Sequence, residues 1–275
     1  MSYSVSSVVS IAGSDSSGGA GIQADIKTIE ALGSFAQTVI TALTAQNTLG
    51  VNDVFDIPAS FVRGQVDAVF SDIRPDAVKI GMVSSAAIAH SIAEGLKAWG
   101  ADRVVLDPVM VSTSGSALIS DDAKRALVEE LFPLASVITP NIPEAEELCG
   151  IDIRTQADME RAARLLGDMT PAAVLVKGGH GASNADDVLW CDGSVEWVRG
   201  RRIETSNAHG TGCTLSSAIA CGLAAGCDVL DAVTEAKRYI SGALAADFDL
   251  GGGGSGPLDH MWEYRLCEGG GLVRR

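Results

Sequence analysis

The chain alternates short runs rich in valine and isoleucine with longer segments of helical period, and this alternation strongly restricts its fold. The first three segments are a strand candidate at Val5 to Ala12, a helix candidate at Gly21 to Leu32 and a strand candidate at Phe35 to Leu43. This βαβ order predicts a mostly parallel sheet covered by helices on both faces. Further candidates are the strands Ala77 to Ile80, Arg103 to Leu106, Val137 to Thr139 and Ala173 to Val176, and the helices Ala86 to Trp99 and Asp121 to Leu131.

The pattern changes in the last third of the chain. The runs Val188 to Cys191 and Val195 to Val198 flank Asp192-Gly193-Ser194, a hairpin signal that predicts antiparallel strands at one edge of the sheet. The length of 275 residues, the hydrophobic content of 47% and the lack of a central linker favour one domain. We expect a three-layer α/β/α domain over residues 1–265 and a flexible tail over residues 266–275.

The composition excludes several classes of function. A formal net charge of −15 argues against a nucleic-acid partner, because a phosphate backbone is bound by clustered Lys and Arg. The N-terminal segment lacks a basic region, and the apolar stretch after it is too short for a signal peptide or a membrane span, so we expect a cytoplasmic protein with no membrane partner. The six cysteines form no C-x-x-C pair and suit a reducing compartment.

A glycine-rich turn is the strongest functional motif. Its sequence is His209-Gly210-Thr211-Gly212-Cys213-Thr214, and it opens a small-residue helix predicted from Cys213 to Ala225. Such a turn aims free backbone N–H groups and the positive end of a helix dipole at one point, where an anion binds. The thiol of Cys213 stands at that point, so we expect a lowered pKa and a role as general base. The alternative is a tight turn followed by a buried cysteine.

Polar residues follow several predicted strands. Asp107, Asn141 and Lys177 each come directly after, or within a few residues of, a strand candidate. Ligands of open α/β sheets bind beyond the carboxyl ends of the strands, so these side chains are expected to lie together. Asp107 and Glu144 are candidates to hold Mg²⁺, which prefers carboxylates and substrate phosphates. Taken singly, Asp107 is also interpreted as a turn residue and Glu144 as compensation of a helix dipole.

The segment from Gly13 to Gly21 admits two interpretations. Residues 19–24 fit the G-x-G-x-x-A pattern of a dinucleotide-binding turn. That pattern requires an acidic residue about twenty residues further on to hold a ribose, and Thr41 to Thr48 contains none, which disfavours NAD. We expect the loop to act instead with Asp25 and Gln46, since a carboxylate and an amide can recognise the edge of an aminopyrimidine. Standing alone, the two would be a helix-surface acid and a loop amide.

Several longer motifs occur in order along nearly the whole chain. They include IAGSDSSGGAGIQADIKT from Ile11, LDPVMVSTSG from Leu106, ITPNIPEAEEL from Ile138 and HGTGCTLSSAIA from His209. In these motifs the chain resembles the hydroxymethylpyrimidine/phosphomethylpyrimidine kinases of thiamin biosynthesis, in the ribokinase superfamily. The resemblance implies a ribokinase-like fold, a homodimer, ATP and Mg²⁺. It also implies phosphorylation of 4-amino-5-hydroxymethyl-2-methylpyrimidine to its monophosphate and then to its diphosphate.

The resemblance also implies roles for individual residues. The anion hole for the transferring phosphoryl group would comprise Gly210, Gly212 and Cys213. The magnesium and phosphate network would include Asp107 and Glu144. The pyrimidine would be held by Asp25 and Gln46, in a pocket also lined by Gly13, Ala20, Met82 and Val109. The residues facing ATP would be Asn141, Lys177, Thr211 and Lys237.

Two alternative functions and two departures from the family pattern remain open. Pyridoxal kinase is the closer alternative, because related enzymes with the same glycine turn phosphorylate a hydroxymethyl group on a pyridine ring. A pyrimidine sensor without catalysis is disfavoured by the retained catalytic groups. Thr113 stands where many relatives carry Lys, and Thr44 where some carry an apolar residue. The Ser/Gly content of Ser112 to Leu118 predicts a loop that closes over the substrate.

Overall fold

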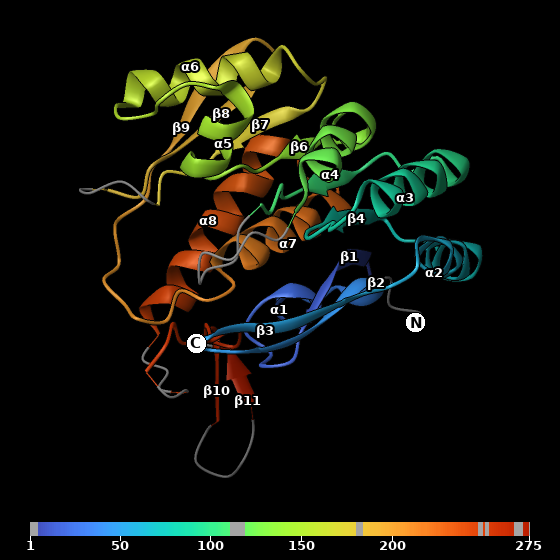
Figure 1. The fold of residues 1–275 in the computed structure, drawn as a ribbon. Coiled ribbons are helices and arrows are strands. Elements are labelled where there is room, and N and C mark those ends of the chain that lie inside the picture. The colour runs from blue at the N-terminus through green and yellow to red at the C-terminus, as the bar shows by residue number, and fades with distance from the viewer. Residues whose placement is uncertain are drawn as a thin grey trace.

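The computed structural model describes residues 5–110, 119–179, 184–246, 250, 253–266 and 272–274. In these residues a nine-stranded sheet runs through the molecule in the order β3-β2-β1-β4-β5-β6-β7-β8-β9 (Figure 1). The strands of this sheet are β1 (Ser7–Asp15), β2 (Phe35–Asn47), β3 (Gly50–Asp56), β4 (Ala77–Ile80), β5 (Val104–Leu106), β6 (Val137–Ile138), β7 (Ala173–Val176), β8 (Asp187–Cys191) and β9 (Ser194–Val198).

The pairing confirms a mostly parallel sheet with an antiparallel edge. Strands β2, β1, β4, β5, β6 and β7 are parallel to their neighbours in this run, whereas β8 and β9 are antiparallel. The predicted hairpin between β8 and β9 turns at Asp192 and Gly193, whose φ angles of 48° and 80° suit the tight turn of a two-residue hairpin. The opposite edge holds β3, antiparallel to β2, which the sequence did not predict. Most of β3 is exposed, so it lacks a buried apolar pattern.

Helices cover both faces of the sheet (Figure 1). One apolar cluster packs α2, α3, the segment from α4 to η2, α5 and α6 on one face, and a second packs α1, α7 and α8 on the other. Successive residues of β5 pack on opposite faces of the sheet: Val104 and Leu106 belong to the first cluster and Val105 to the second. The helices are α1 (Gly21–Ala31), α2 (Ala59–Ser71), α3 (Ala86–Trp99), α4 (Asp121–Ala126), η1 (Leu127–Leu131), η2 (Phe132–Leu134), α5 (Ile142–Cys149), α6 (Gln156–Gly167), α7 (Thr211–Ala224) and α8 (Val229–Ala245).

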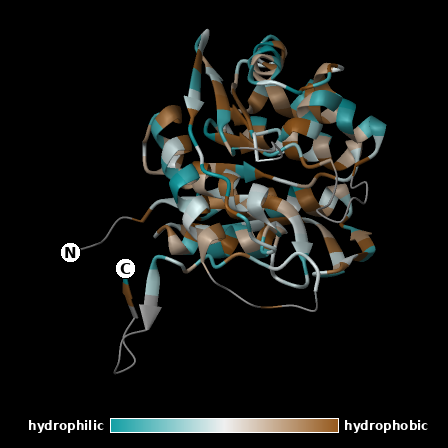
Figure 2. Ribbon diagram, turned by 90° about the vertical axis from the view of Figure 1, so that its left-hand side faces the viewer, coloured by the Kyte–Doolittle hydropathy of each residue, from teal (hydrophilic) through white to brown (hydrophobic). Residues whose placement is uncertain are grey.

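Local sequence signals explain where α3 begins and ends. The Ser85 hydroxyl accepts a hydrogen bond from the Ile88 N–H at the start, and Gly100, with φ 61°, ends the helix in the left-handed conformation. Surface helices show both hydrophilic and hydrophobic segments in Figure 2, as amphipathic helices do. The helix predicted at Asp121 to Leu131 is α-helical up to Ala126 and continues as a π-helical turn.

The C-terminal segment forms a small hairpin apart from the main sheet. Strand β10 (Tyr264–Leu266) pairs antiparallel with β11 (Leu272–Arg274). The Arg274 guanidinium lies 2.7 Å from the Glu263 carboxylate, which also binds Arg238 of α8. The segment expected to be a flexible tail therefore contains a paired strand. In the described part of the chain, no helix has the length and apolar character that crossing a membrane requires.

Candidate active site

A cavity of about 550 Å³ lies at the carboxyl ends of the parallel strands. Strand-end residues, the loop after β1 and the beginning of α7 line it, as expected for an open α/β sheet. Of the predicted site residues, all except Asp25 line this cavity. They are Gly13, Ala20, Gln46, Met82, Asp107, Val109, Asn141, Glu144, Lys177, Gly210, Thr211, Gly212, Cys213 and Lys237.

The glycine turn joins two distant segments at the cavity. Gly210 is the N-cap of α7 and has φ 85°, a conformation that favours glycine. A Cβ atom at Gly210 would lie 2.0 Å from the carbonyl oxygen of Gly19, so the turn packs directly against the loop after β1. The helix begins at Thr211, two residues earlier than predicted. Its first turn leaves backbone N–H groups available at the cavity.

A lysine and an aspartate meet beside this turn. The Lys177 ammonium lies 2.6 Å from Asp107 Oδ1, which also accepts a hydrogen bond from the Thr139 hydroxyl. A Cβ at Gly212 would lie 3.2 Å from Asp107 Oδ2 and 3.4 Å from Lys177 Nζ. Burial lowers the pKa of Lys177, but Asp107 and Glu144 raise it by more, so the ammonium stays charged. A cation, a carboxylate and helix N–H groups thus converge on one point.

Glu144 and Asn141 form a capping box at the start of α5. The Glu144 N–H donates to Asn141 Oδ1 at 2.9 Å, and the Asn141 N–H donates to Glu144 Oε2 at 2.8 Å. Burial raises the pKa of Glu144 to about 7; Lys177 opposes this shift and Asp107 adds to it. Glu144 therefore has two roles. It caps the start of α5, as the helix-dipole interpretation expects, and it lies on the cavity wall beside Asp107.

The predicted direction of the Cys213 pKa shift is wrong. Burial raises the pKa of the thiol to about 11; Lys79 opposes this shift, and Asp25 and Asp107 add to it. The Cys213 side chain is half-buried at the cavity wall, and its desolvation outweighs the local effect of the helix N-terminus, because a thiolate there loses much of its hydration. The thiol is therefore protonated at neutral pH in this structure, which favours Cys213 as part of the anion hole over Cys213 as general base.

Asp25 does not occupy the place that the sequence suggested. Its side chain is fully buried beneath the cavity, and both carboxylate oxygens lie within 3.0 Å of the Lys79 ammonium. The hydroxyls of Ser10 and Ser217 also donate to it, at 2.5 and 2.8 Å. A carboxylate so occupied accepts no hydrogen bond from a ligand in the cavity, so the expectation that Asp25 holds the pyrimidine is corrected. The pair links α1, β4 and α7 instead.

Lys237 reaches the cavity from α8. Its ammonium lies 2.7 Å from Asp187 Oδ2 and 2.5 Å from the carbonyl oxygen of Ala185. The other oxygen of Asp187 accepts the Gly178 N–H at 2.8 Å, and Gly178 follows Lys177 directly after strand β7. Burial raises the pKa of Asp187, and Lys237 opposes this shift. Asp187 therefore fixes both lysine-bearing segments at the cavity wall.

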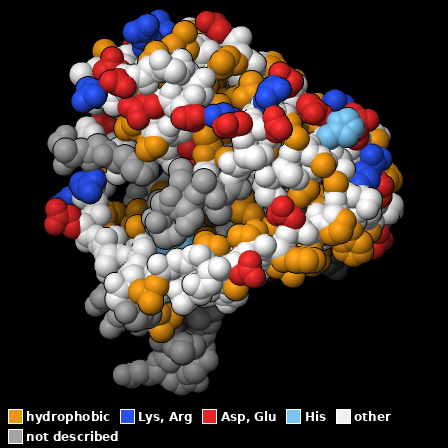
Figure 3. Space-filling view, viewed as in Figure 1, with side chains coloured by type: hydrophobic (Ala, Val, Ile, Leu, Met, Phe, Trp, Pro, Cys, Tyr) orange, Lys and Arg blue, Asp and Glu red, His pale blue; other side chains and the backbone are white. Residues whose placement is uncertain are grey.

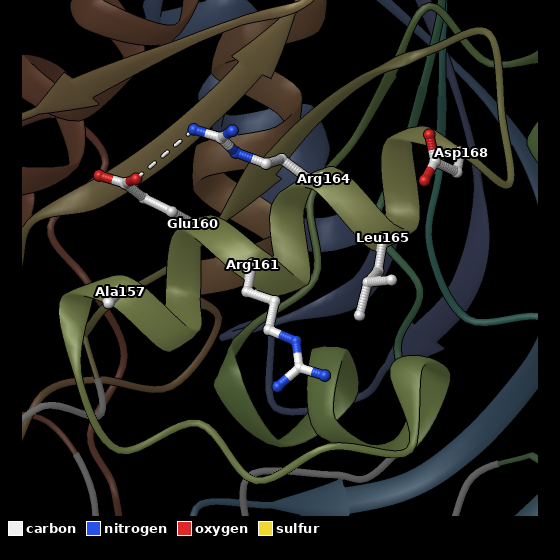
Figure 4. Close-up of a pocket in the computed structure, with 6 residues that line it drawn as sticks. All are labelled: Ala157, Glu160, Arg161, Arg164, Leu165 and Asp168. Carbon is white, nitrogen blue, oxygen red and sulfur yellow. Dashed lines mark ion pairs between the residues drawn. The ribbon is translucent and has the colours of Figure 1, made fainter.

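A second hollow of about 340 Å³ lies on α6 (Figure 4). Arg161 and Arg164 point in different directions there, and Arg164 lies 3.7 Å from Glu160 and over the ring of Trp190. These side chains do not converge on a ligand, and no strand end or glycine turn contributes to the hollow. The cavity beside the glycine turn is therefore the candidate active site.

Comparisons with known proteins agree with this geometry. A sequence profile of the family described as phosphomethylpyrimidine kinase matches residues 15–259. The chain belongs to the phosphomethylpyrimidine kinase family. The hydroxymethylpyrimidine/phosphomethylpyrimidine kinase of Rhizobium meliloti is 52% identical over 259 residues, which cover 93% of this chain and 97% of that protein. Family membership confirms the resemblance predicted from the motifs and identifies the protein as a kinase.

Solved structures of kinases share the fold of this phosphomethylpyrimidine kinase family member. A phosphomethylpyrimidine kinase from Clostridium difficile is 46% identical, with a TM-score of 0.78, and the match covers 87% of this chain and 99% of that one. The ADP complex of a Bacillus subtilis pyridoxal kinase is 36% identical, with a TM-score of 0.85, and covers 94% of this chain and 98% of that one. The predicted ribokinase-like fold is confirmed.

The kinase cavity also contains residues that sequence reasoning missed. His209 and Asp15 form a buried pair at 2.8 Å across the glycine turn, which the sequence motifs did not predict. Arg201 and Arg202 line the cavity from the chain between β9 and α7. Their cationic pair in an acidic chain was a visible signal for phosphate binding. The predicted closing loop, Ser112 to Leu118, and Thr113 within it lie outside the described residues.

Proposed function

We propose that this kinase transfers the γ-phosphoryl group of ATP to the hydroxymethyl oxygen of 4-amino-5-hydroxymethyl-2-methylpyrimidine. The same site then phosphorylates the monophosphate to the diphosphate, for thiamin biosynthesis. The observation that carries the proposal is the convergence of Lys177, Asp107 and the N-terminus of α7 at Gly212. Phosphoryl transfer depends mainly on alignment and charge neutralisation, which such a cluster provides.

The transfer forms a bond from the hydroxymethyl oxygen to phosphorus and breaks the bond between the γ-phosphorus and ADP. Gly210, Gly212 and Cys213 stabilise the negative charge of the transferring group through the start of α7. Lys177 neutralises the same charge from the strand end. Because the Cys213 thiol holds its proton at neutral pH, the proposal assigns it to the anion hole.

The nucleotide is proposed to lie along the side of the cavity formed by Asn141, Lys177, Thr211 and Lys237. Lys237 and Lys177 are charged groups at this wall, and Arg201 and Arg202 are the further cations there. Cations gathered in a chain of net charge −15 fit the phosphates of ATP rather than a nucleic acid. Two kinase structures of this fold from Staphylococcus aureus and Bacillus subtilis contain ADP.

Asp107 and Glu144 are proposed to hold Mg²⁺. The fit rests on their chemistry: Asp107 keeps Oδ2 toward the glycine turn while Oδ1 binds Lys177, and Glu144 is the second carboxylate on the same wall. Within the described residues no cluster of three or more His, Cys, Asp or Glu is found. Two carboxylates suit Mg²⁺, which takes its remaining ligands from water and phosphates. The ion, when bound, supplies charge neutralisation for the phosphates.

The pyrimidine is proposed to bind between Gly13, Ala20, Met82 and Val109, with Gln46 at its edge. A Cβ at Gly13 would lie 2.8 Å from the Met82 methyl group, so the absence of a side chain there opens space beside Met82. Asp25 is not included, because its carboxylate is buried with Lys79. An apolar slot with one amide at its edge suits a small heterocycle.

A homodimer in the cytoplasm is proposed for the whole protein. Strands β2 and β3 and helix α2 expose large apolar side chains, including Phe55 at 65% and Phe61 at 64%. In Figure 3 the lower half of the molecule, around β2 and β3, carries few charged side chains. Such a surface is typical of a contact with another copy. Free cysteines in the described residues suit a reducing compartment. We propose one kinase domain over residues 1–265.

The proposal is tested by measuring ADP release with Mg²⁺ and ATP. The pyrimidine, its monophosphate and pyridoxal are compared at equal concentrations. Turnover of both pyrimidines with little turnover of pyridoxal is expected. Turnover of pyridoxal alone would move the assignment to a pyridoxal kinase, a function favoured by the similarity to the Bacillus subtilis enzyme. Binding without turnover would support a pyrimidine sensor.

A further inference from the structure

The side-chain amide of Gln46 stands between two polar neighbours on the cavity wall. Its Oε1 lies 3.1 Å from Thr44 Oγ1 and its Nε2 lies 3.3 Å from His209 Nε2. The backbone of Gln46 is also held, because its N–H donates to Ser16 Oγ and its carbonyl accepts from the same hydroxyl. The residue is therefore fixed at both ends, and the orientation of the amide decides which group faces a ligand.

A backbone hydrogen bond of the Thr44 hydroxyl determines whether this hydroxyl donates to the Gln46 amide or accepts from it. Thr44 Oγ1 lies 2.7 Å from the backbone carbonyl oxygen of Ser14, which can only accept a hydrogen bond. A hydroxyl has one proton, and the shorter contact takes it. Thr44 Oγ1 is then left with lone pairs toward Gln46. It therefore requires a donor from the amide, which is the nitrogen.

The His209 ring gives the same answer independently. Its Nε2 lies 2.8 Å from Asp15 Oδ2. Burial raises the pKa of Asp15, but hydrogen bonds from His209, Ser17 and Ala20 outweigh it and hold the pKa at about 2, so the carboxylate is ionised. A lone pair on Nε2 would face that negative charge, so Nε2 carries the proton. The Nε2 proton is donated to Asp15, and a protonated Nε2 has no lone pair to accept a hydrogen bond from the amide nitrogen of Gln46. The amide oxygen is therefore the group of Gln46 that suits the place beside His209 Nε2.

A half-turn of the planar amide exchanges its oxygen and nitrogen, which gives Thr44 Oγ1 a donor and places the amide oxygen, rather than an N–H group, beside the protonated His209 Nε2. We infer that Thr44 and His209 hold the Gln46 amide with its nitrogen toward Thr44, so that its second N–H is offered to a ring nitrogen of the ligand. Thr44 is thus a positioning residue for recognition of the heterocycle. The inference rests on the proposed function for the identity of that heterocycle, and extends it to the protein groups that determine specificity.

The test is a double-mutant cycle of Thr44→Val and Gln46→Ala with steady-state kinetics. Thr44→Val removes the acceptor for the amide nitrogen at nearly constant volume. We expect it to raise KM for the pyrimidine about 3- to 10-fold, the loss of one net hydrogen bond, with kcat and KM for ATP unchanged. In the Gln46→Ala background the same substitution is expected to have no further effect on that KM.

Matched controls separate positioning from a structural effect. Thr44→Ser keeps the hydroxyl and is expected to retain the KM of the parent, whereas Thr44→Ala is expected to behave like Thr44→Val. Thr38 lies on the same strand and does not line the cavity, so Thr38→Val should leave KM unchanged. An equal effect of Thr44→Val with and without Gln46, or no effect at all, would overturn the inference. Failure of the proposed function gives a different result, because the parent enzyme would then phosphorylate pyridoxal and not the pyrimidine. In that case the same double-mutant cycle is measured with pyridoxal as the substrate.

Discussion

Replacing Gly210 by alanine tests whether the contact between the glycine turn and the loop after β1 organises the site. The new Cβ would lie 2.0 Å from the Gly19 carbonyl oxygen and 3.3 Å from Ala20 Cα. Side-chain Cβ atoms are essentially never found closer than 3.0 Å to another heavy atom, so the turn and the loop must separate by about 1 Å or more. That shift moves the start of α7 away from Lys177 and Asp107.

Two costs are expected from this substitution. A non-glycine residue at φ 85° costs about 1–2 kcal/mol of folding free energy. Displacing an anion hole by about 1 Å lowers kcat by about 100-fold, because catalysis depends on near-contact alignment. We expect kcat for the phosphorylation of the pyrimidine to fall by this factor, measured by coupled ADP release, while the melting temperature falls by only a few degrees.

Gly226 provides a matched control at the other end of α7. Its φ of 87° is nearly the same as that of Gly210, but a Cβ there would meet nothing within 4 Å. Gly226→Ala therefore carries the same backbone cost without the close contact. If both variants lowered the melting temperature equally and kept kcat within about threefold of each other, the close approach of Gly210 to Gly19 would have no catalytic importance.

Three further predictions follow from the charges around the cavity. Lys177→Met leaves Asp107 without its ammonium partner; we expect kcat/KM for ATP to fall at least about 100-fold and the unfolding free energy in urea to fall by about 3 kcal/mol. Glu144 has a folded-state pKa of about 7 against 4.5 ordinarily, so its contribution to stability is present below pH 4.5 and is lost as the pH rises toward 7. Glu144→Gln should flatten that decline in urea titrations, and an unchanged slope would contradict it. The Cys213 thiol, with a pKa of about 11, should be alkylated by iodoacetamide slowly at pH 7 and faster toward pH 11, as measured by peptide mass spectrometry. Exposed Cys227 reports the activity of the reagent, and fast alkylation of Cys213 at pH 7 would restore the general-base hypothesis.

Much of the site was predictable because of the parallel sheet. Asp107 and Lys177 are 70 residues apart in sequence, yet both follow strands whose carboxyl ends share one edge. A rule about parallel strands therefore brings them together without knowledge of side-chain packing. The glycine turn was predictable from its motif, and Gly210 has the positive φ that favours glycine. The hairpin at Asp192 and Gly193 follows the same logic.

Other features depended on partners that no local pattern indicates. Asp25 was predicted to face a ligand, but Ser217 and Lys79 come from distant elements and enclose it. His209 pairs with Asp15 across 194 residues. Strand β3 was missed because its exposed residues show no alternation.

The sequence by itself determined the βαβ order and the family, and all but one of the site residues that it predicted line the cavity, since these features depend on local period, motif and the common edge of parallel strands. Only the tertiary structure decided the protonation of Cys213 and the burial of Asp25. It also decided the hydrogen-bonding partners of Gln46. The physical reason is that desolvation and hydrogen-bond pairing depend on which groups surround an atom in space. Cys213 shows the difference most clearly: its place at a helix N-terminus predicts a low pKa, and its burial raises that pKa to about 11.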